Sequence, residues 1–220
     1  MRKIKFVPGE FYHIYNRGND KKDIFRAHAD YARFLFGTLF FQAPVPIYNI
    51  SRYISSYVKH RVFNIPTDTQ RKIIEKRGVE LVAFTFMPNH FHLLLYECSE
   101  SGISNYMQRV LNAYTKYFNT KYDRSGHLFQ GPFHAKYVET NEQLLYLSAY
   151  IHRNQRDLPT WTNKEQLYPW SSYHQYTHEN KLGDLLATQR ILGQFKNQKE
   201  YQEFVDTSGA KEKEDVELVI

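Results

Sequence analysis

The chain contains one cysteine, Cys98, so neither a disulfide framework nor a cysteine-rich zinc module is available to it. No run of 18 or more apolar residues occurs, which excludes a membrane-spanning helix. The first residues carry charge but lack the apolar stretch that a secretory signal requires. These absences predict a reducing, cytosolic setting with no membrane contact.

Positive charge and aromatic side chains are plentiful instead. A net charge of +6 and a pI near 9.2 favour an acidic partner, nucleic acid first and an anionic membrane surface second. Charge alone leaves an ordinary, mildly basic protein as an equal alternative. Hydrophobic residues make up 42% of the chain, enough for a core, so the chain is not disordered.

The spacing of apolar residues predicts an α+β protein. It indicates strands over 10–18, 79–88 and 90–96, a short extended piece within 126–140, and helices over 20–42, 101–122 and 141–155. The second and third strands form a hairpin or one long strand bent at Pro88. Ser104 and Asn141 are candidate caps for the last two helices. This order is typical of an antiparallel sheet with helices on one face, in the ferredoxin-like split βαβ topology.

Two segments lie outside this pattern. Residues 43–76 contain three prolines, scattered aromatics and a basic centre, and are predicted to be an insertion with a small helical excursion. From 177 onward, two short helical stretches, over 184–195 and 198–206, and the charged run KEKEDVE predict a helical C-terminal extension. The sequence assigns neither segment a role.

The run FMPNHFHLLLY places two histidines inside an apolar strand. Side chains alternate along a strand, so His90 and His92 share one face and Phe91 points to the other. Such a pair alone is more often structural than metal-binding. A metal site needs at least one further ligand.

The helix over 141–155 offers that ligand and a nucleophile. Tyr150 and Asn154 are four residues apart and therefore neighbours on one helix face, with Tyr146 one turn earlier. The carbonyl oxygen of Asn154 can bind a divalent ion, and the phenol of Tyr150 can attack a DNA phosphodiester. A phenol with a pKa near 10 is a better leaving group than an alcohol, so the bond can be resealed without ATP.

Two rival assignments, another nucleophile and another class of enzyme, fit the sequence less well. Tyr114 and Tyr117 are alternative nucleophiles, but Tyr114 lies on an apolar helix face, and Lys121 stands where Tyr117 would need a ligand. A histidine-triad nucleotide hydrolase needs a third histidine at position 94, which is Leu94.

Several sequence blocks carry a family resemblance. The chain resembles the single-tyrosine HUH transposases of insertion-sequence type, and most closely the REP-associated tyrosine transposases. The matching blocks are FYHIYNRGNDKKDIFRAHADYARFL, FMPNHFHLLL, SNYMQRVLNAYTKYFNTKYDRSGHLFQGPFHAKYV, YLSAYIHRN and YPWSSY, in order from about Tyr12 to Tyr176.

The resemblance implies a ferredoxin-like (RRM-like) core over 1–176, with the insertion 43–76, followed by the extension 177–220. It implies nicking and rejoining of single-stranded or hairpin DNA through a covalent 5′-phosphotyrosine on Tyr150. The family's metal ligands fall on His90, His92 and Asn154, for Mg²⁺ or Mn²⁺ and without a nucleotide cofactor. One departure is Gln155, where this branch usually has proline, which affects how the helix ends.

Partners and location follow from the same resemblance. The expected setting is the prokaryotic cytoplasm, in association with the nucleoid. A homodimer that exchanges the tyrosine helix and a monomer both stay open. A domesticated, sequence-specific DNA-binding protein without cleavage activity is the alternative function.

Basic residues suggest where DNA would lie. Candidate backbone contacts are Arg17, Lys21, Lys22, Arg109, Lys116, Lys121, Arg124, Lys136 and Arg153, although a solvated face is the ordinary explanation of such charge. Phe129 and Phe133 are candidates for base stacking. Among the remaining histidines, His13 is singled out because its strand is expected beside the one that holds His90.

Overall fold

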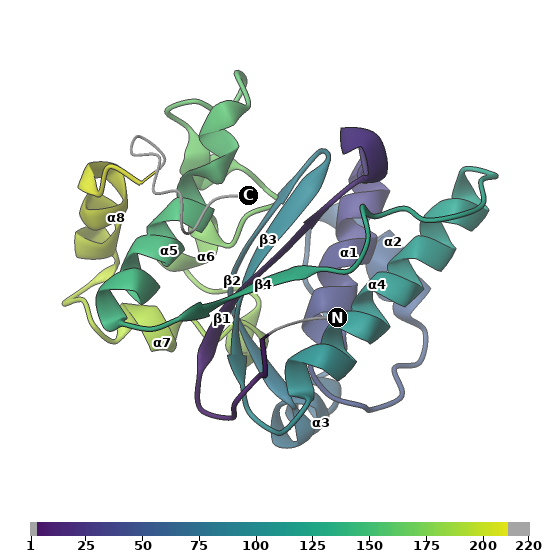
Figure 1. Cartoon of the computed structure of the whole chain (residues 1–220), viewed down its shortest axis with the longest axis horizontal. Coiled ribbons are helices and arrows are strands. Elements are labelled where there is room, and N and C mark those ends of the chain that lie inside the picture. The colour runs from purple at the N-terminus through teal and green to yellow at the C-terminus, as the bar shows by residue number, and fades with distance from the viewer. Residues whose placement is uncertain (1–3, 211–220) are drawn as a thin grey trace.

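The structure, a computed structural model, describes residues 4–210, and its centre is one antiparallel sheet (Figure 1). The strands are β1 (Phe11–Arg17), β2 (Val79–Met87), β3 (His90–Glu97) and β4 (His134–Val138), in the spatial order β2-β3-β1-β4. With α1 (His28–Phe40) and α4 (Gly102–Lys121), the chain order is βαββαβ. The predicted α+β class and ferredoxin-like topology are confirmed.

Strand β1 lies between β3 and β4, and this order determines which residues of β1 lie beside His90 and His92. Tyr15 pairs with His92 and His13 with Leu94. Met87 pairs with His90, so β2 and β3 form a tight hairpin rather than one bent strand. His13, Tyr15 and the two β3 histidines therefore share one face of the sheet.

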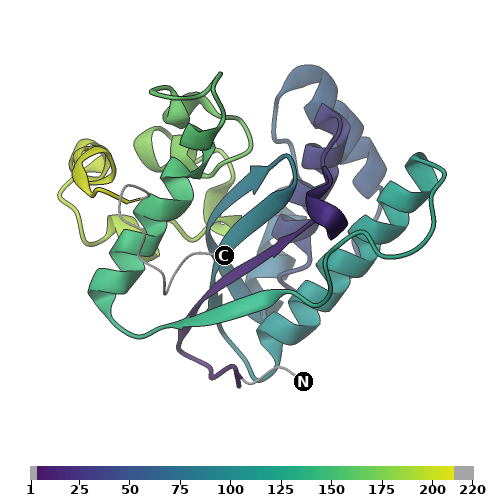
Figure 2. The same ribbon diagram turned by 45° about the horizontal axis from the view of Figure 1, so that its top comes forward.

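Helices cover both faces of this sheet, whereas the sequence predicts helices on one face. Figures 1 and 2 show α1 and α4 on one side and α5 (Asn141–Arg153) on the other. Phe91 faces α1, with its ring 5.0 Å from that of Phe34, while His92 faces α5. The physical reason is that β2 is buried along its whole length, so both of its faces need apolar cover.

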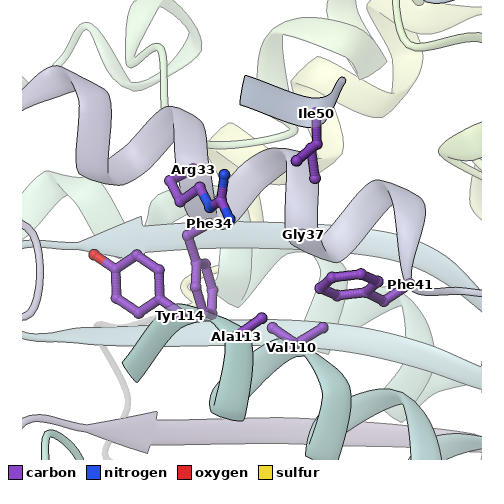
Figure 3. Close-up of a pocket in the computed structure, with 8 residues that line it drawn as sticks. All are labelled: Arg33, Phe34, Gly37, Phe41, Ile50, Val110, Ala113 and Tyr114. Carbon is purple, nitrogen blue, oxygen red and sulfur yellow. The ribbon is translucent and has the colours of Figure 1, made fainter. Parts of the chain in front are cut away.

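The insertion 43–76 forms α2 (Ile50–His60) and α3 (Thr67–Lys76). Tyr57 of α2 packs its ring 5.6 Å from Phe36 of α1, so the insertion thickens the α1 side of the sheet. A small pocket lies where α1, the start of α2 and α4 meet, beside Gly37 and Ile50 (Figure 3). Its volume of about 10 Å³ is near the lower limit for one water, so it is a packing seam and not a ligand site.

The C-terminal part folds back over α5. It contains α6 (Tyr173–Thr177), α7 (Gln189–Leu192) and α8 (Gln198–Thr207). Tyr201 of α8 is fully buried against this layer. The expected helix over 184–195 is reduced to a 3-10 turn and α7, and the predicted charged run KEKEDVE lies outside the described residues.

Helix starts differ slightly from the sequence predictions. The cap of α5 is Thr140, whose hydroxyl accepts the Gln143 N–H at 3.2 Å, and not Asn141. Ser104 lies within the first turn of α4, so it is not the cap. Helix α1 begins at His28, later than expected, because residues before it form a 3-10 turn and an extended segment. Within 4–210, no helix combines the length and apolar character needed to cross a bilayer.

Candidate active site

The four residues predicted to form the site come together at one end of the sheet. His90 and His92 stand at the start of β3, directly after the hairpin turn, and α5 carries Tyr150 and Asn154 over them. The Nε2 atom of His90 lies 3.2 Å from Oδ1 of Asn154. The ring of Tyr150 lies 5.5 Å from that of His92, edge to face. Residues 60 positions apart therefore share one polar cluster.

The neighbours of His90 fix its orientation. Its Nδ1 lies 2.7 Å from Oδ1 of Asn89, an oxygen that can only accept, so Nδ1 donates. In the neutral ring, Nε2 then presents a lone pair toward the Asn154 oxygen. Two acceptors this close are stabilised by a cation, which is the arrangement that a metal site requires.

His13 holds His92 in a similar way. The Nε2 atom of His13 lies 2.8 Å from Nδ1 of His92, so the predicted proximity of their strands is confirmed. Burial lowers the pKa of His13 to about 3, with a smaller contribution from the charge of Lys136. His13 is therefore neutral at physiological pH. When it accepts the Nδ1–H of His92, the Nε2 atom of His92 keeps a lone pair that a metal ion could use.

Tyr150 is only 5% exposed. Burial raises the pKa of Tyr150 to about 12, the charge of Asp157 adds to this, and a hydrogen bond with Asn154 opposes it. The phenol is therefore protonated at neutral pH and must lose its proton before it can act as a nucleophile.

The rival tyrosines lie on α4, across the sheet, and the hydroxyl of each is bonded to another part of the fold. The hydroxyl of Tyr114 donates to the carbonyl of Ile24 at 2.5 Å, and that of Tyr117 donates to Asp30 at 2.9 Å. Neither lies on the face of the sheet that carries His92.

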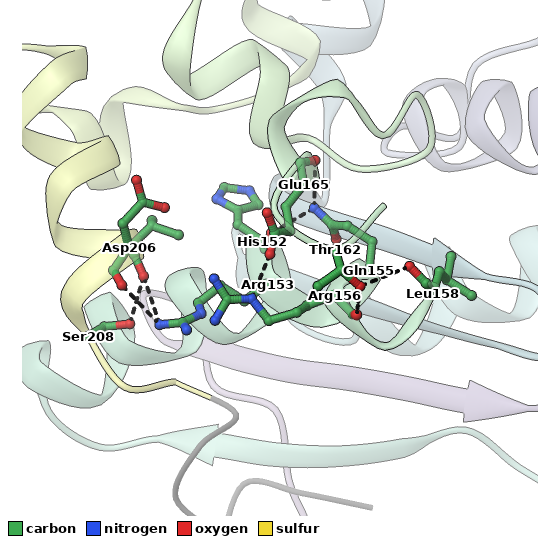
Figure 4. A network of polar contacts seen from close by, with 10 residues as sticks. His152, Arg153, Gln155, Arg156, Leu158, Thr162, Glu165, Asp206 and Ser208 are labelled. Atoms are coloured by element: carbon green, nitrogen blue, oxygen red, sulfur yellow. Dashed lines mark hydrogen bonds and ion pairs between the residues drawn. The ribbon is translucent and has the colours of Figure 1, made fainter. Parts of the chain in front are cut away.

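The end of α5 is held by buried polar contacts (Figure 4). Gln155 donates to the carbonyls of His152 and Glu165 at 2.6 and 3.0 Å, where α5 gives way to a 3-10 turn at Asn154. Gln155, which stands where the resembled branch usually has proline, thus makes side-chain hydrogen bonds that a proline could not make. Arg153 is 2% exposed and donates to the carbonyl of Val205 at 3.1 Å. It links α5 to α8, which corrects its assignment as a DNA contact.

Two more residues predicted to contact DNA have partners within the protein. Arg109 donates to the carbonyl of Phe41 at 2.8 Å, and Lys121 pairs with buried Asp30 at 2.6 Å. The two candidate stacking residues, Phe129 and Phe133, are buried, so they are not available to bases. Sequence reasoning missed these roles because each depends on a partner far away in the chain.

The remaining basic candidates are accessible to different degrees. Lys21, Lys22 and Lys116 are exposed, while Arg17, Arg124 and Lys136 are half-buried. The segment that holds Lys21 lies beside the site, because the N–H of Gly18 donates to the carbonyl of Asn89 at 2.8 Å. Lys116 belongs to α4, across the sheet.

The donor set fits a divalent ion only if the amide oxygen takes part. Within residues 4–210, no three or more His, Cys, Asp or Glu side chains gather into a metal-binding group. Two imidazole nitrogens and one amide oxygen suit Mn²⁺, Ni²⁺ or Zn²⁺ more readily than Mg²⁺. The orientation of His90 and His92 by their neighbours supports this fit.

Comparisons with known proteins place these residues in context. The family model described as "Transposase IS200 like" matches residues 41–154, a range that includes every candidate ligand and Tyr150. A solved structure described as "Structure of the REP associates tyrosine transposase bound to a REP hairpin" is similar with a TM-score of 0.50 and 13% identity. The match covers 80% of this chain and 82% of that chain, and at this identity it shows a shared fold. No curated protein matches the sequence.

Proposed function

The chain belongs to the IS200-like transposase family, and we propose that it nicks and rejoins single-stranded DNA through Tyr150. Membership of that family makes DNA the partner and transposition the general activity. The observation that carries the finer proposal is the position of the Tyr150 ring, 5.5 Å from His92 and next to Asn154.

In the proposed reaction, Oη of Tyr150 attacks a phosphorus of the DNA backbone. The new Oη–P bond replaces the bond from phosphorus to the 3′ oxygen, which leaves as a 3′-hydroxyl after it gains a proton. The phenol loses its own proton in the same step. The 5′-phosphate stays on the tyrosine until another 3′-hydroxyl attacks and restores the phenol, so no ATP is needed.

We further propose that His90, His92 and Asn154 bind Mg²⁺ or Mn²⁺, which would offset the charge that develops on the phosphate oxygens. The chain's own residues prepare this site. Asn89 orients His90, and His13 orients His92. Both imidazoles must be neutral to bind, so metal binding is expected to weaken as pH falls below their pKa values.

The DNA is proposed to be a single strand next to a hairpin, in keeping with the hairpin named in the description of the similar structure. The segment from Arg17 to Lys22 is the favoured backbone contact, because it lies beside the hairpin turn that leads into His90. Such a substrate implies action at the chromosome, in the prokaryotic cytoplasm. DNA binding without cleavage is the alternative, and the following experiment separates the two.

The test incubates the protein with labelled single-stranded hairpin DNAs, with Mn²⁺ or with EDTA, and resolves the products on a denaturing protein gel. We expect a metal-dependent covalent band that disappears in Tyr150→Phe. A band that survives in Tyr150→Phe would assign the nucleophile to another tyrosine, with Tyr117 next. Binding without a band for any DNA would leave the protein in the binding-only class.

A further inference from the structure

A groove of about 800 Å³ lies away from the candidate active site. One wall is the end of α2 and the residues after it, including Tyr57, Arg61 and Phe63. The opposite wall is formed by 167–182, including His174 and Lys181. The insertion that the sequence could not explain therefore builds half of this groove.

The two charged side chains that line the groove, Arg61 and Lys181, are both cations. Among the described residues that line it there is no Asp or Glu. The sequence from 43 to 66 also contains no acidic residue, and 43–76 has six basic and two acidic residues, a net charge of +4. The pKa of His174 is lowered first by burial and then by the charges of His178 and Lys181. An anionic occupant is favoured.

Apolar surface alternates with these charges. Val62 and Leu167 are 57% and 55% exposed, large values for hydrophobic side chains. The half-buried rings of Tyr57 and Phe63 lie beside them. Cations interleaved with flat apolar groups are typical of surfaces that bind single-stranded nucleic acid, whose phosphates and bases alternate in the same way.

Arg61 has an unusual backbone for a charged residue. It ends α2 with φ of 58°, in the left-handed region where glycine is preferred, and its N–H donates to the Tyr57 carbonyl at 2.8 Å. Its guanidinium lies 5.7 Å above the ring of Trp170 and 3.1 Å from Nδ1 of His28. The helix end thus carries a cation at the groove where the local backbone alone would favour glycine.

The groove is connected to the end of the sheet that carries the site. The hydroxyl of Tyr168 donates to the carbonyl of Phe86 at 2.6 Å, and the Phe86 N–H donates to the Trp170 carbonyl at 2.9 Å. Phe86 precedes His90 by only the hairpin turn. The wall of the groove formed by 167–182 is therefore bonded to β2, the strand that leads into the hairpin before His90.

We propose that this groove binds the single-stranded DNA that flanks the segment held at Tyr150. Arg61 and Lys181 contact its phosphates, and Tyr57 and Phe63 provide surfaces for its bases. The inference rests on the proposed function for its choice of DNA as the ligand, but not on Tyr150 being the nucleophile.

The first test measures the affinity of a fluorescein-labelled 20-nucleotide oligo(dT) by anisotropy over a range of salt concentrations. The Arg61→Gly/Lys181→Gln variant removes both cations, and glycine suits the backbone of position 61. We expect affinity to fall about tenfold and the salt slope to decrease by about 1.4, the value for two lost contacts to a single strand. Lys196→Gln/Lys199→Gln removes two exposed charges near α8 and is expected to keep the wild-type slope.

A second test locates the DNA directly. An oligonucleotide with 5-iododeoxyuridine is crosslinked by ultraviolet light, and the attached peptides are identified by mass spectrometry. Crosslinks within 57–63 or 167–182 are expected. Unchanged affinity and salt slope in the double variant, together with crosslinks only elsewhere, would overturn the proposal that the groove binds DNA. The same result is expected if the partner of the groove is an acidic protein.

The covalent band separates this proposal from the previous one. The control variant Lys196→Gln/Lys199→Gln, outside the groove, is expected to give as much Tyr150-dependent band as the wild type. If no protein gives a band but the difference in affinity remains, the reaction is overturned and the groove is supported. If the band forms but the double variant binds DNA as tightly as the wild type and no crosslink falls within 57–63 or 167–182, only the proposal of the groove is overturned.

Discussion

His13 contacts one ring nitrogen of His92 and thereby bears on its tautomer. Its Nε2 atom lies 2.8 Å from Nδ1 of His92, and its lowered pKa keeps it neutral. When the neutral His13 accepts at this point, His92 takes the tautomer whose Nε2 can bind a metal. His13 is thus a positioning residue, and its importance depends on strand order that the HFH motif does not contain.

Substitution of His13 is expected to reveal this role in metal affinity. Loss of a partner that orients a metal-binding histidine typically lowers affinity 10- to 100-fold. We expect His13→Leu to lower Mn²⁺ affinity, measured by isothermal titration calorimetry, by about that factor. His13→Gln retains an acceptor oxygen and is expected to recover part of the loss. His127→Gln, at an exposed histidine, serves as the control, and equal affinity in all three variants would contradict the role.

The junction of α1 and α4 depends on one buried carboxylate. Asp30 accepts the N–H groups of Arg26 and Ala27 at 2.9 Å, and it pairs with Lys121 at 2.6 Å. The hydroxyls of Tyr117 and Tyr122 donate to it as well. Asp30 therefore caps the start of one helix and anchors the end of the other.

Asp30→Asn is expected to lower the free energy of unfolding at pH 7 by about 3 kcal/mol, because it leaves the Lys121 ammonium and several donors poorly paired. Burial alone would raise the pKa of Asp30, but the bonds from Lys121 and Tyr122 outweigh it, so the pKa is lowered. The carboxylate then stabilises the fold above its ordinary pKa, and this contribution is lost as pH falls toward the folded value.

Urea unfolding at pH 7 and near pH 3 measures both effects. The difference between wild type and Asp30→Asn is expected to shrink at the lower pH. Asp68→Asn, at an exposed ion pair with Arg71, is the matched control and is expected to change little. A variant as stable as the wild type at pH 7 would refute the anchoring role.

Helix α5 is bonded to the C-terminal layer through His152. The Nδ1 atom of His152 lies 2.7 Å from the hydroxyl of Tyr201, and Nε2 lies 2.7 Å from that of Ser172. Tyr201 also donates to the hydroxyl of Ser148 at 3.1 Å. These contacts fix the rotation of the helix that presents Tyr150.

Tyr201→Phe removes one partner of a buried imidazole. We expect it to lower the free energy of unfolding by about 1–3 kcal/mol, the usual penalty for an unsatisfied buried polar group. Urea denaturation followed by circular dichroism measures the change. Tyr48→Phe, at a side chain that is 76% exposed, is expected to have no effect, and equal stabilities for both variants would exclude the bond as a stabilising contact.

The sequence predicts a helix or strand well where the periodic pattern of apolar residues continues over many residues. Helix α4 shows this in Ile103, Met107 and Val110, and the spacing of Tyr150 and Asn154 on α5 placed both over the site. Local chemistry was less decisive: Thr140 and Asn141 are both good caps, and only the backbone selects Thr140. The burial of Phe129 depends on α4 and β3 packing around it, which no local pattern records.

At the scale of the whole molecule, the C-terminal extension is part of the scaffold of the site. Arg153 donates to the carbonyl of Val205, and Gln155 donates to that of Glu165, so the end of α5 is bonded to later parts of the same chain. The boundary predicted near 176 stays a prediction. These bonds nevertheless argue that a chain ending there would lose partners of the helix that carries Tyr150.

The same bonds bear on whether the tyrosine acts within its own chain. His90 and Asn154 of one chain already lie 3.2 Å apart, and exchange of α5 alone with a second copy would break the contacts that His152, Arg153 and Gln155 make with later parts of the chain. We therefore expect an equimolar mixture of Tyr150→Phe and His92→Ala to give no covalent band with Mn²⁺ and hairpin DNA. Each variant alone is the control, together with wild type diluted twofold by Tyr150→Phe, which should keep its band. A band restored in the mixture would show that the tyrosine helix crosses to a partner, and would make a homodimer the active form.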